Sequence, residues 1–304
     1  MSQPISVVVP VYDGVTQLDF TGPHQFLSRT PDLHVLVASL DGQPVTADRL
    51  TFSNLEDLGA IGSCDVLLVP GGGGCLNAIE DDRFLKEIVR LGTTARYLTS
   101  VCTGSLILGA AGFLRGRRAA CHWAWWELLP VFGAIVDEGR IVRDGNILSG
   151  GGVTAGIDFV LALIAELRGT RVAEMVQLGL EYAPEPPFDS GGPDTAPADV
   201  LEAVNARTTT CASRRLGGRP SCRPGRDGRT AGRVTSIGTR MAVSGLPIPF
   251  RGYGQATPVN DTDGGSNERK RKARFQRGAG RRLEAGFETA RQRRRSGRLL
   301  AGTG

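Results

Sequence analysis

Short apolar, β-branched runs alternate with segments of helical period through the first 204 residues, and this alternation constrains the fold more than any other feature. Strand-like runs cover residues 5–12, 34–40, 65–70 and 96–101, and residues 82–91 have the spacing of an amphipathic helix. Strands separated by helices form βαβ units with right-handed crossovers. The sequence therefore predicts an α/β fold whose mostly parallel sheet is covered on both faces.

The later part of the same region continues this pattern. An Asp144-Gly145 pair is typical of a tight turn between two strands. The remaining predicted elements are two or three short strands over residues 134–149 and helices over 104–112, 154–167, 171–182 and 198–206.

The chain divides into two regions of opposite charge, so its formal net charge of +5 describes neither. Residues 1–204 contain 13 Lys and Arg against 25 Asp and Glu, a net charge of −12. Residues 205–304 contain 23 against 6, a net charge of +17, and their apolar residues follow no period. Ordering costs about 1–2 kcal/mol per residue, and this tail has little to offset it. We expect one folded domain over 1–204 and a disordered basic tail over 205–304.

The cysteines and the chain start indicate a reducing compartment. The first residues contain no signal-like basic region or cleavage site, and no apolar run approaches the roughly 18 residues of a membrane span. The six cysteines show no CxxC spacing, and a chain of this size does not need disulfides. We therefore expect a cytoplasmic protein with reduced cysteines.

One cysteine lies at a predicted strand-to-helix turn, in the segment Thr99-Ser100-Val101-Cys102-Thr103-Gly104-Ser105. A nucleophile elbow has this geometry, with small neighbours that allow close backbone approach. The helix N-terminus after Cys102 is expected to lower the thiol pKa. The alternative is that Cys102 only fills the core, since free cysteine is among the most buried residue types.

An acidic residue follows the first predicted strand and would reach the same sheet edge as the cysteine. Asp19 lies in an apolar setting, and burial raises the pKa of a carboxyl group. Asp19 would then be protonated, donate to the Cys102 sulfur and act as general acid and base. Alternatively, Asp19 only caps a helix over residues 22–29.

Two further segments offer groups to the same edge. The glycine run 71–74 follows a parallel strand, so its backbone N–H groups can turn toward an anion, and the Thr103 N–H is another donor. His122 is far enough along the chain to return beside Cys102, although a histidine flanked by tryptophan is more often a packing residue. Cys121 beside His122 has no further ligands at metal-binding spacing, so no metal is expected.

Several motifs together resemble the ThiJ/PfpI superfamily, and within it the bacterial isonitrile hydratases, over nearly all of residues 4–204. They are Gln17-Leu18-Asp19-Phe20-Thr21-Gly22-Pro23, Pro70-Gly71-Gly72, the 99–105 elbow, His122-Trp123, residues 150–158 and the ending that starts Glu181-Tyr182-Ala183-Pro184. Asp19, Thr103 after the cysteine and that ending are the more specific features.

The resemblance implies a flavodoxin-like α/β sandwich, related to class I glutamine amidotransferases, that forms a homodimer. It also implies a hydro-lyase that hydrates an isonitrile, R–NC, to an N-substituted formamide without a cofactor. Carried onto this chain, Cys102 would be the nucleophile, Asp19 the acid/base, and Thr103 a neighbour that helps hold substrate or water. Gly72, Gly73 and His122 would contact substrate or developing charge. Gly73 departs from the pattern, where a threonine is expected, and this alters the pocket wall.

Two rival functions remain open. Glyoxalase- or deglycase-like members of the superfamily act on α-oxoaldehyde adducts and usually carry Glu at the position of Asp19. AraC-type regulators join a similar sensor domain to a DNA-binding domain, but residues 207–304 lack the helical apolar spacing that two helix-turn-helix units need. The tail could bind nucleic acid non-specifically through charge. An Arg/Gly-rich run is also what a shifted reading frame of a G+C-rich gene would produce.

Overall fold

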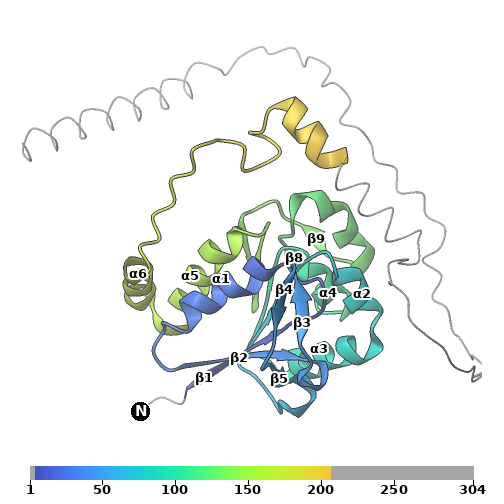
Figure 1. Ribbon diagram of the computed structural model, residues 1–304, viewed down its shortest axis with the longest axis vertical. Helices are drawn as coiled ribbons and strands as arrows, with labels where there is room; N and C mark the ends of the chain where they lie inside the picture. The colour runs from blue at the N-terminus through green and yellow to red at the C-terminus, as the bar shows by residue number, and fades with distance from the viewer. Residues whose placement is uncertain (1–3, 207–304) are drawn as a thin grey trace, which may run out of the picture. The chain divides into compact units, whose positions relative to one another are not determined.

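The computed structural model describes residues 4–206, and a seven-stranded sheet forms its centre (Figure 1). Its strands are β1 (Ile5–Pro10), β2 (Leu33–Ser39), β5 (Glu56–Asp57), β6 (Val66–Val69), β7 (Tyr97–Val101), β10 (Ile141–Asp144) and β11 (Ile147–Gly150). They are ordered β10-β11-β7-β6-β1-β2-β5. Neighbouring strands are parallel, except that β10 and β11 are antiparallel. The expected α/β fold with a mostly parallel sheet is confirmed.

Helices cover both faces of this sheet, as its parallel strands require. One face is covered by α1 (Gln17–Leu27), α5 (Ala155–Arg168) and α6 (Thr170–Gly179), and the other by α2 (Cys75–Glu80), α3 (Asp82–Thr94) and α4 (Gly104–Ala110) (Figure 1). Short 3-10 helices are η1 (Leu40–Gly42), η2 (Leu58–Ala60) and η3 (Trp123–Phe132). Two small additional sheets pair β3 (Val45–Ala47) with β4 (Leu50–Phe52) and β8 (Arg118–Ala119) with β9 (Ile135–Val136).

The central strands β6 and β7 are buried along their whole length. β6 reads Val-Leu-Leu-Val without polar alternation, and burial of each such side chain contributes about 1.5–3 kcal/mol. β7 carries polar residues within the core, and each has a partner. The Thr99 hydroxyl donates to the Leu67 carbonyl at 3.0 Å, and the Ser100 hydroxyl lies 2.9 Å from that of Ser105. Each of these buried hydroxyl groups therefore has a hydrogen-bond partner within the core.

The order of the strands creates one crevice at their carboxyl ends. The chain leaves β1 for β2 on one side of it and later returns to β6 and β7 on the other. A parallel sheet binds ligands where the direction of strand addition reverses, because the loops there separate. The segments that follow β1, β6 and β7 meet at this point, and they carry Asp19, the glycine run and Cys102.

The predicted strands and most predicted helices agree with the structure to within a few residues. The exception is α1, which begins at Gln17 rather than residue 22 and has Pro23 in its interior. The buried side chains of Phe20, Phe26 and Leu27 lie before and after the proline, so packing offsets the missing N–H donor. The earlier start places Asp19 in the first helical turn.

The C-terminal end of the described region is helical over residues 198–206, as expected. The predictions for the basic tail, apart from residues 205–206, lie outside the described residues. Within residues 4–206, no helix is long and apolar enough to span a membrane.

Candidate active site

Cys102 occupies a sharp turn between β7 and α4. Its backbone is left-handed, with a φ of +59°, a conformation that costs a non-glycine residue about 1–3 kcal/mol. The Cys102 N–H donates to the carbonyl oxygens of Gly150 and Gly151, at 3.1 and 2.8 Å, which fixes the turn to the end of β11. A Cβ on Gly104 would lie 2.1 Å from the Val69 carbonyl oxygen, so only glycine fits there. The structure therefore has the expected elbow geometry.

Asp19 lies in the first turn of α1 and has no exposed surface. Its Oδ2 accepts a hydrogen bond from the Gly71 N–H at 3.0 Å, across the crevice after β6. Its Oδ1 is buried and has no hydrogen-bond partner among the described residues. The carboxyl group is therefore turned away from its own helix, which argues against a role in capping that helix alone.

Burial controls the ionisation of Asp19. It raises the pKa of the carboxyl to about 7, while hydrogen bonding to the Gly71 N–H and the Cys102 thiol lowers it. The thiol and the carboxyl therefore lie within reach of each other. A pKa near neutrality allows one group to donate a proton and take it back during a reaction.

The prediction that the helix N-terminus lowers the pKa of the Cys102 thiol is wrong for the site without substrate. Burial and the neighbouring Asp19 and Cys121 raise the pKa, and these effects outweigh hydrogen bonding from the Thr103 N–H. The side chain is only 5% exposed, so a helix of seven residues cannot compensate for lost solvation. Above about pH 7 the Cys102–Asp19 pair therefore keeps one proton, which lies mainly on the sulfur, and the thiolate form arises when that proton moves to Asp19.

Thr103 connects the elbow to the glycine run. Its Oγ1 accepts a hydrogen bond from the Gly72 N–H at 2.8 Å and lies 3.3 Å from the Gly72 carbonyl oxygen, to which it can donate. Glycine at position 71 allows this close approach, since a Cβ there would lie only 2.4 Å from the Thr103 nitrogen. Gly72 itself has a φ of +141°, a conformation that favours glycine. The side chain of Thr103 is thus fixed to the glycine run, one residue after Cys102.

The glycine run contributes its N–H groups unequally. The Gly72 N–H is already bonded to the Thr103 hydroxyl, whereas Gly73 is exposed in the turn before α2. Gly71, which the sequence analysis offered only as one member of the glycine run, supplies the N–H that holds Asp19. The position of Gly71 directly after a buried strand was the available signal. The roles predicted for Gly72 and Gly73 toward a substrate remain predictions.

His122 packs on the loop after β11 that also holds the elbow, and a hydrogen bond within its own segment orients its ring. It precedes η3, where its Nδ1 accepts a hydrogen bond from the Ala124 N–H at 3.2 Å. Because Nδ1 accepts, we assign the proton of the neutral ring to Nε2. Burial lowers the pKa of the imidazole, which favours this neutral form. A Cβ on Gly152 would lie 3.1 Å from the ring, so His122 packs on the loop after β11.

A buried hydrogen-bond network places the segment before His122. The Ser105 hydroxyl donates to the Ala120 carbonyl at 2.5 Å, and the Ala120 N–H donates to the Ser149 hydroxyl at 2.8 Å. Ser105 is in α4 and Ser149 in β11, so both neighbours of the elbow hold the same short segment. The backbone at Ala120 is therefore held from two elements, and this fixes where Cys121 and His122 begin.

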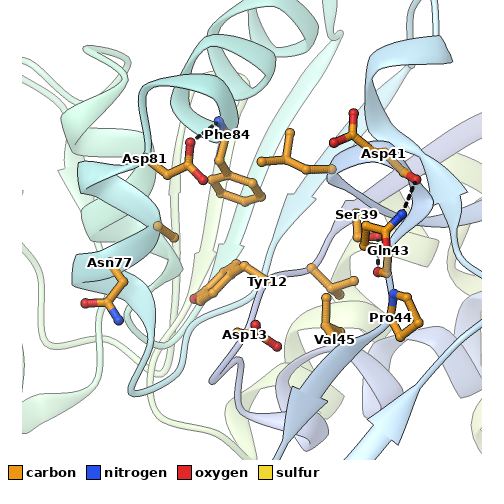
Figure 2. Close-up of a pocket in the computed structure, with 13 residues that line it drawn as sticks. Tyr12, Asp13, Ser39, Asp41, Gln43, Pro44, Val45, Asn77, Asp81 and Phe84 are labelled. Carbon is orange, nitrogen blue, oxygen red and sulfur yellow. Dashed lines mark hydrogen bonds between the residues drawn. The ribbon is translucent and has the colours of Figure 1, made fainter. Parts of the chain in front are cut away.

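Tyr12 is a further group at the site that the sequence reasoning missed. Its hydroxyl donates to the Pro70 carbonyl at 3.1 Å, and burial with nearby Cys75, Asp19 and Cys102 raises its pKa. On the α2 and α3 side, the ring lines a cavity of about 410 Å³ together with Phe84 (Figure 2). A tyrosine as the last residue of a predicted strand carries no distinctive sequence signal.

The cysteines of residues 4–206, namely Cys64, Cys75, Cys102 and Cys121, form no disulfide with one another. In this part of the chain, no group of three or more His, Cys, Asp or Glu side chains is arranged to hold a metal ion.

Comparisons with known proteins agree with this geometry. The profile described as the DJ-1/PfpI family matches residues 5–166. Isonitrile hydratase of Pseudomonas putida is 50% identical over 200 residues, which cover 65% of this chain and 87% of that protein. The transcriptional regulator CdhR of Pseudomonas aeruginosa is 35% identical over 150 residues, which cover 47% of this chain and 43% of the regulator. The crystal structure of a THiJ/PfpI family protein from Pseudomonas syringae is 41% identical, with a TM-score of 0.67 over 72% of this chain and 92% of that one.

Proposed function

This chain belongs to the DJ-1/PfpI family, and from that premise we propose that it hydrates isonitriles to N-substituted formamides at Cys102. One observation carries the proposal. Asp19 is fixed through Oδ2, while its buried Oδ1 has no partner among residues 4–206 and its thiol neighbour lies within reach. Such a pair can deliver a proton and a sulfur nucleophile to one carbon. The 50% identity to an isonitrile hydratase supports this choice of substrate.

The first step begins with the pair in its thiolate form. The carbon of R–NC is a poor electrophile until it is protonated. Asp19 donates its proton to that carbon while the Cys102 sulfur forms a bond to it. The product is a thioimidate, R–N=CH–S, on Cys102, and Asp19 is left ionised.

The second step uses the ionised Asp19 as a base. Asp19 takes a proton from water as the water oxygen attacks the thioimidate carbon, and the imine nitrogen receives that proton. The tetrahedral intermediate then collapses. The C–S bond breaks, the hydroxyl proton passes to Asp19, and the formamide R–NH–CHO leaves. The thiolate and the protonated acid are regenerated, so the steps need no cofactor.

The surrounding groups have supporting roles in this proposal. The Thr103 N–H hydrogen-bonds the Cys102 sulfur and stabilises its negative charge. The Thr103 hydroxyl, held by Gly72, would orient the substrate or water. We propose Gly73 and the Nε2–H of His122 as further substrate contacts. We also propose that the protein acts as a cytoplasmic homodimer.

A second candidate is a sensor domain of the AraC-type regulators. The similarity to CdhR favours it, although the match covers only 43% of that regulator. A sensor would bind a ligand at the elbow without turnover, so a catalytic assay separates the two functions.

The test is formamide production from a simple alkyl isonitrile by the full chain. We expect Cys102→Ser and Asp19→Asn each to reduce turnover at least about a hundredfold, since each removes a proton-transfer or nucleophilic group. Cys64→Ser is the matched control, because Cys64 is also a buried free thiol but precedes the opposite end of β6. Near-normal turnover in both site variants would show that the mechanism is wrong. A folded parent chain that turns over methylglyoxal but no isonitrile would instead support the glyoxalase-like alternative.

A further inference from the structure

One peptide unit joins Tyr12 to Asp19. The Tyr12 hydroxyl donates to the carbonyl oxygen of Pro70 at 3.1 Å, and the N–H of the same peptide, on Gly71, donates to Asp19 Oδ2 at 3.0 Å. Both hydrogen bonds are buried. We propose that Tyr12 is a positioning residue for Asp19, and that it acts by fixing and polarising the Pro70–Gly71 peptide. Its importance for turnover rests on the proposed acid/base role of Asp19.

Packing holds Tyr12 in place for this contact. The tyrosine follows β1 and is 8% exposed, and its ring meets Phe84 edge to face, with centroids 5.4 Å apart. Figure 2 shows the ring at the wall of the cavity, beside the first turn of α3. The hydroxyl donates to the Pro70 carbonyl oxygen. Replacing tyrosine by phenylalanine would therefore keep the ring contacts and remove one donor.

The two hydrogen bonds reinforce each other. A donor on a peptide oxygen polarises the peptide and makes its N–H a stronger donor, especially in a region of low dielectric constant. An N–H that donates to a carboxyl favours the ionised form of that carboxyl. The Tyr12 hydroxyl therefore opposes the effect of burial, which raises the pKa of Asp19 to about 7.

Other titratable groups act on the same site, and none replaces this donor. Asp48, on the turn between β3 and β4, raises the pKa of Asp19, whereas hydrogen bonding to Cys102 lowers it. Asp19 also contributes to the raised pKa values of Cys102 and Cys121. Burial, with Cys75, Asp19 and Cys102, raises the pKa of Tyr12, so its hydroxyl keeps its proton throughout the neutral range.

The test is Tyr12→Phe in the full chain, read by ¹³C NMR titration of labelled aspartate carboxyl groups. Asp19 is assigned by the signal that Asp19→Asn removes. We expect the midpoint of the Asp19 titration to rise by about half a pH unit, because the N–H donor is weakened. Tyr97→Phe is the matched control. Tyr97 is a buried tyrosine at the far end of β7, and its hydroxyl donates to Glu166 at 2.8 Å.

The outcomes are distinct. A rise in Tyr12→Phe with no change in Tyr97→Phe supports the proposal, and the acid limb of the pH–rate profile should then move by the same amount. An unchanged or lowered midpoint, or equal shifts in both variants, overturns it. The carboxyl titration needs no isonitrile, so it gives a result even if the proposed hydration fails. In the unsubstituted chain, the NMR chemical shift of the Gly71 amide proton should change with pH at the same midpoint as the Asp19 carboxyl. If that chemical shift does not follow the Asp19 titration, the proposal is also overturned.

Discussion

Replacing the buried acid should stabilise the fold at neutral and alkaline pH. Asp19→Asn keeps the shape of the side chain, and its amide oxygen can still accept from the Gly71 N–H. In the folded chain the pKa of Asp19 is about 7, against an ordinary value of 3.8. Between these values the folded state holds a proton that the unfolded state has lost. Stability contributed by Asp19 is therefore complete below about pH 4 and is lost as the pH rises through 7.

The size of the effect follows from the pKa difference. Each unit corresponds to 1.36 kcal/mol, so the contribution of Asp19 falls by about 2.6 kcal/mol between pH 5 and pH 8. Asparagine cannot ionise and loses none of this. Relative to the parent chain, Asp19→Asn should thus gain about 2.6 kcal/mol over this interval, or about 5–10 °C in Tm for a domain of about 200 residues.

Equilibrium urea unfolding at pH 5 and pH 8 measures this difference. The groups whose pKa values Asp19 raises, Cys102, Cys121 and Tyr12, are kept protonated by burial in the folded chain over this interval, so the pH dependence of the shared groups nearly cancels. Asp189→Asn is the control, since Asp189 is exposed on the C-terminal segment and should show no such gain. If the difference between Asp19→Asn and the parent changes by less than about 0.5 kcal/mol, a third of a pKa unit, then the argument from burial is refuted.

Two other perturbations address the elbow and the tail. Gly71→Ala should lower stability by about 1–3 kcal/mol and abolish the proposed isonitrile hydration. The new Cβ would lie only 2.4 Å from the Thr103 nitrogen, so the backbone of the elbow would have to move. Gly62→Ala, which has open space around it, should change neither property, and equal effects in both would contradict the contact argument. Deletion of residues 207–304 should leave unchanged both the rate of the proposed hydration and the mass of the proposed dimer, measured by light scattering. A large loss of either would show that the tail contributes to the folded domain.

The sequence predicted the sheet and the meeting of three strand ends, since both depend on patterns along the chain. Apolar runs without alternation mark buried parallel strands, and parallel strands place their carboxyl ends together. Asp19 and Cys102 each follow one of these strands, so their proximity could be inferred before any geometry was known. The cysteine turn was predictable for the same reason, because small residues such as Gly104 surround it.

The ionisation of the site could not be predicted in the same way. The expected fall in the pKa of Cys102 depended on the helix after it, but the depth of burial decides the sign. Depth of burial arises from packing between segments distant in sequence. The distribution of backbone donors is equally hidden, because Gly71 holds Asp19 while Gly72 is bonded to Thr103. A run of identical residues gives no signal for this division.

The proposed catalytic groups are also the costly features of the domain. Cys102 has a left-handed backbone, and Asp19 is buried where ionisation destabilises the fold. Neither residue is required by the sheet, whose central strands are satisfied without them. Hydrogen bonds from neighbouring strand ends hold both residues in these unfavourable states. The carbonyl groups of Gly150 and Gly151 hold the elbow, and the Gly71 N–H holds Asp19. Substitutions that relieve these costs should therefore stabilise the chain and abolish hydration together, which distinguishes a strained catalytic site from a poorly packed core.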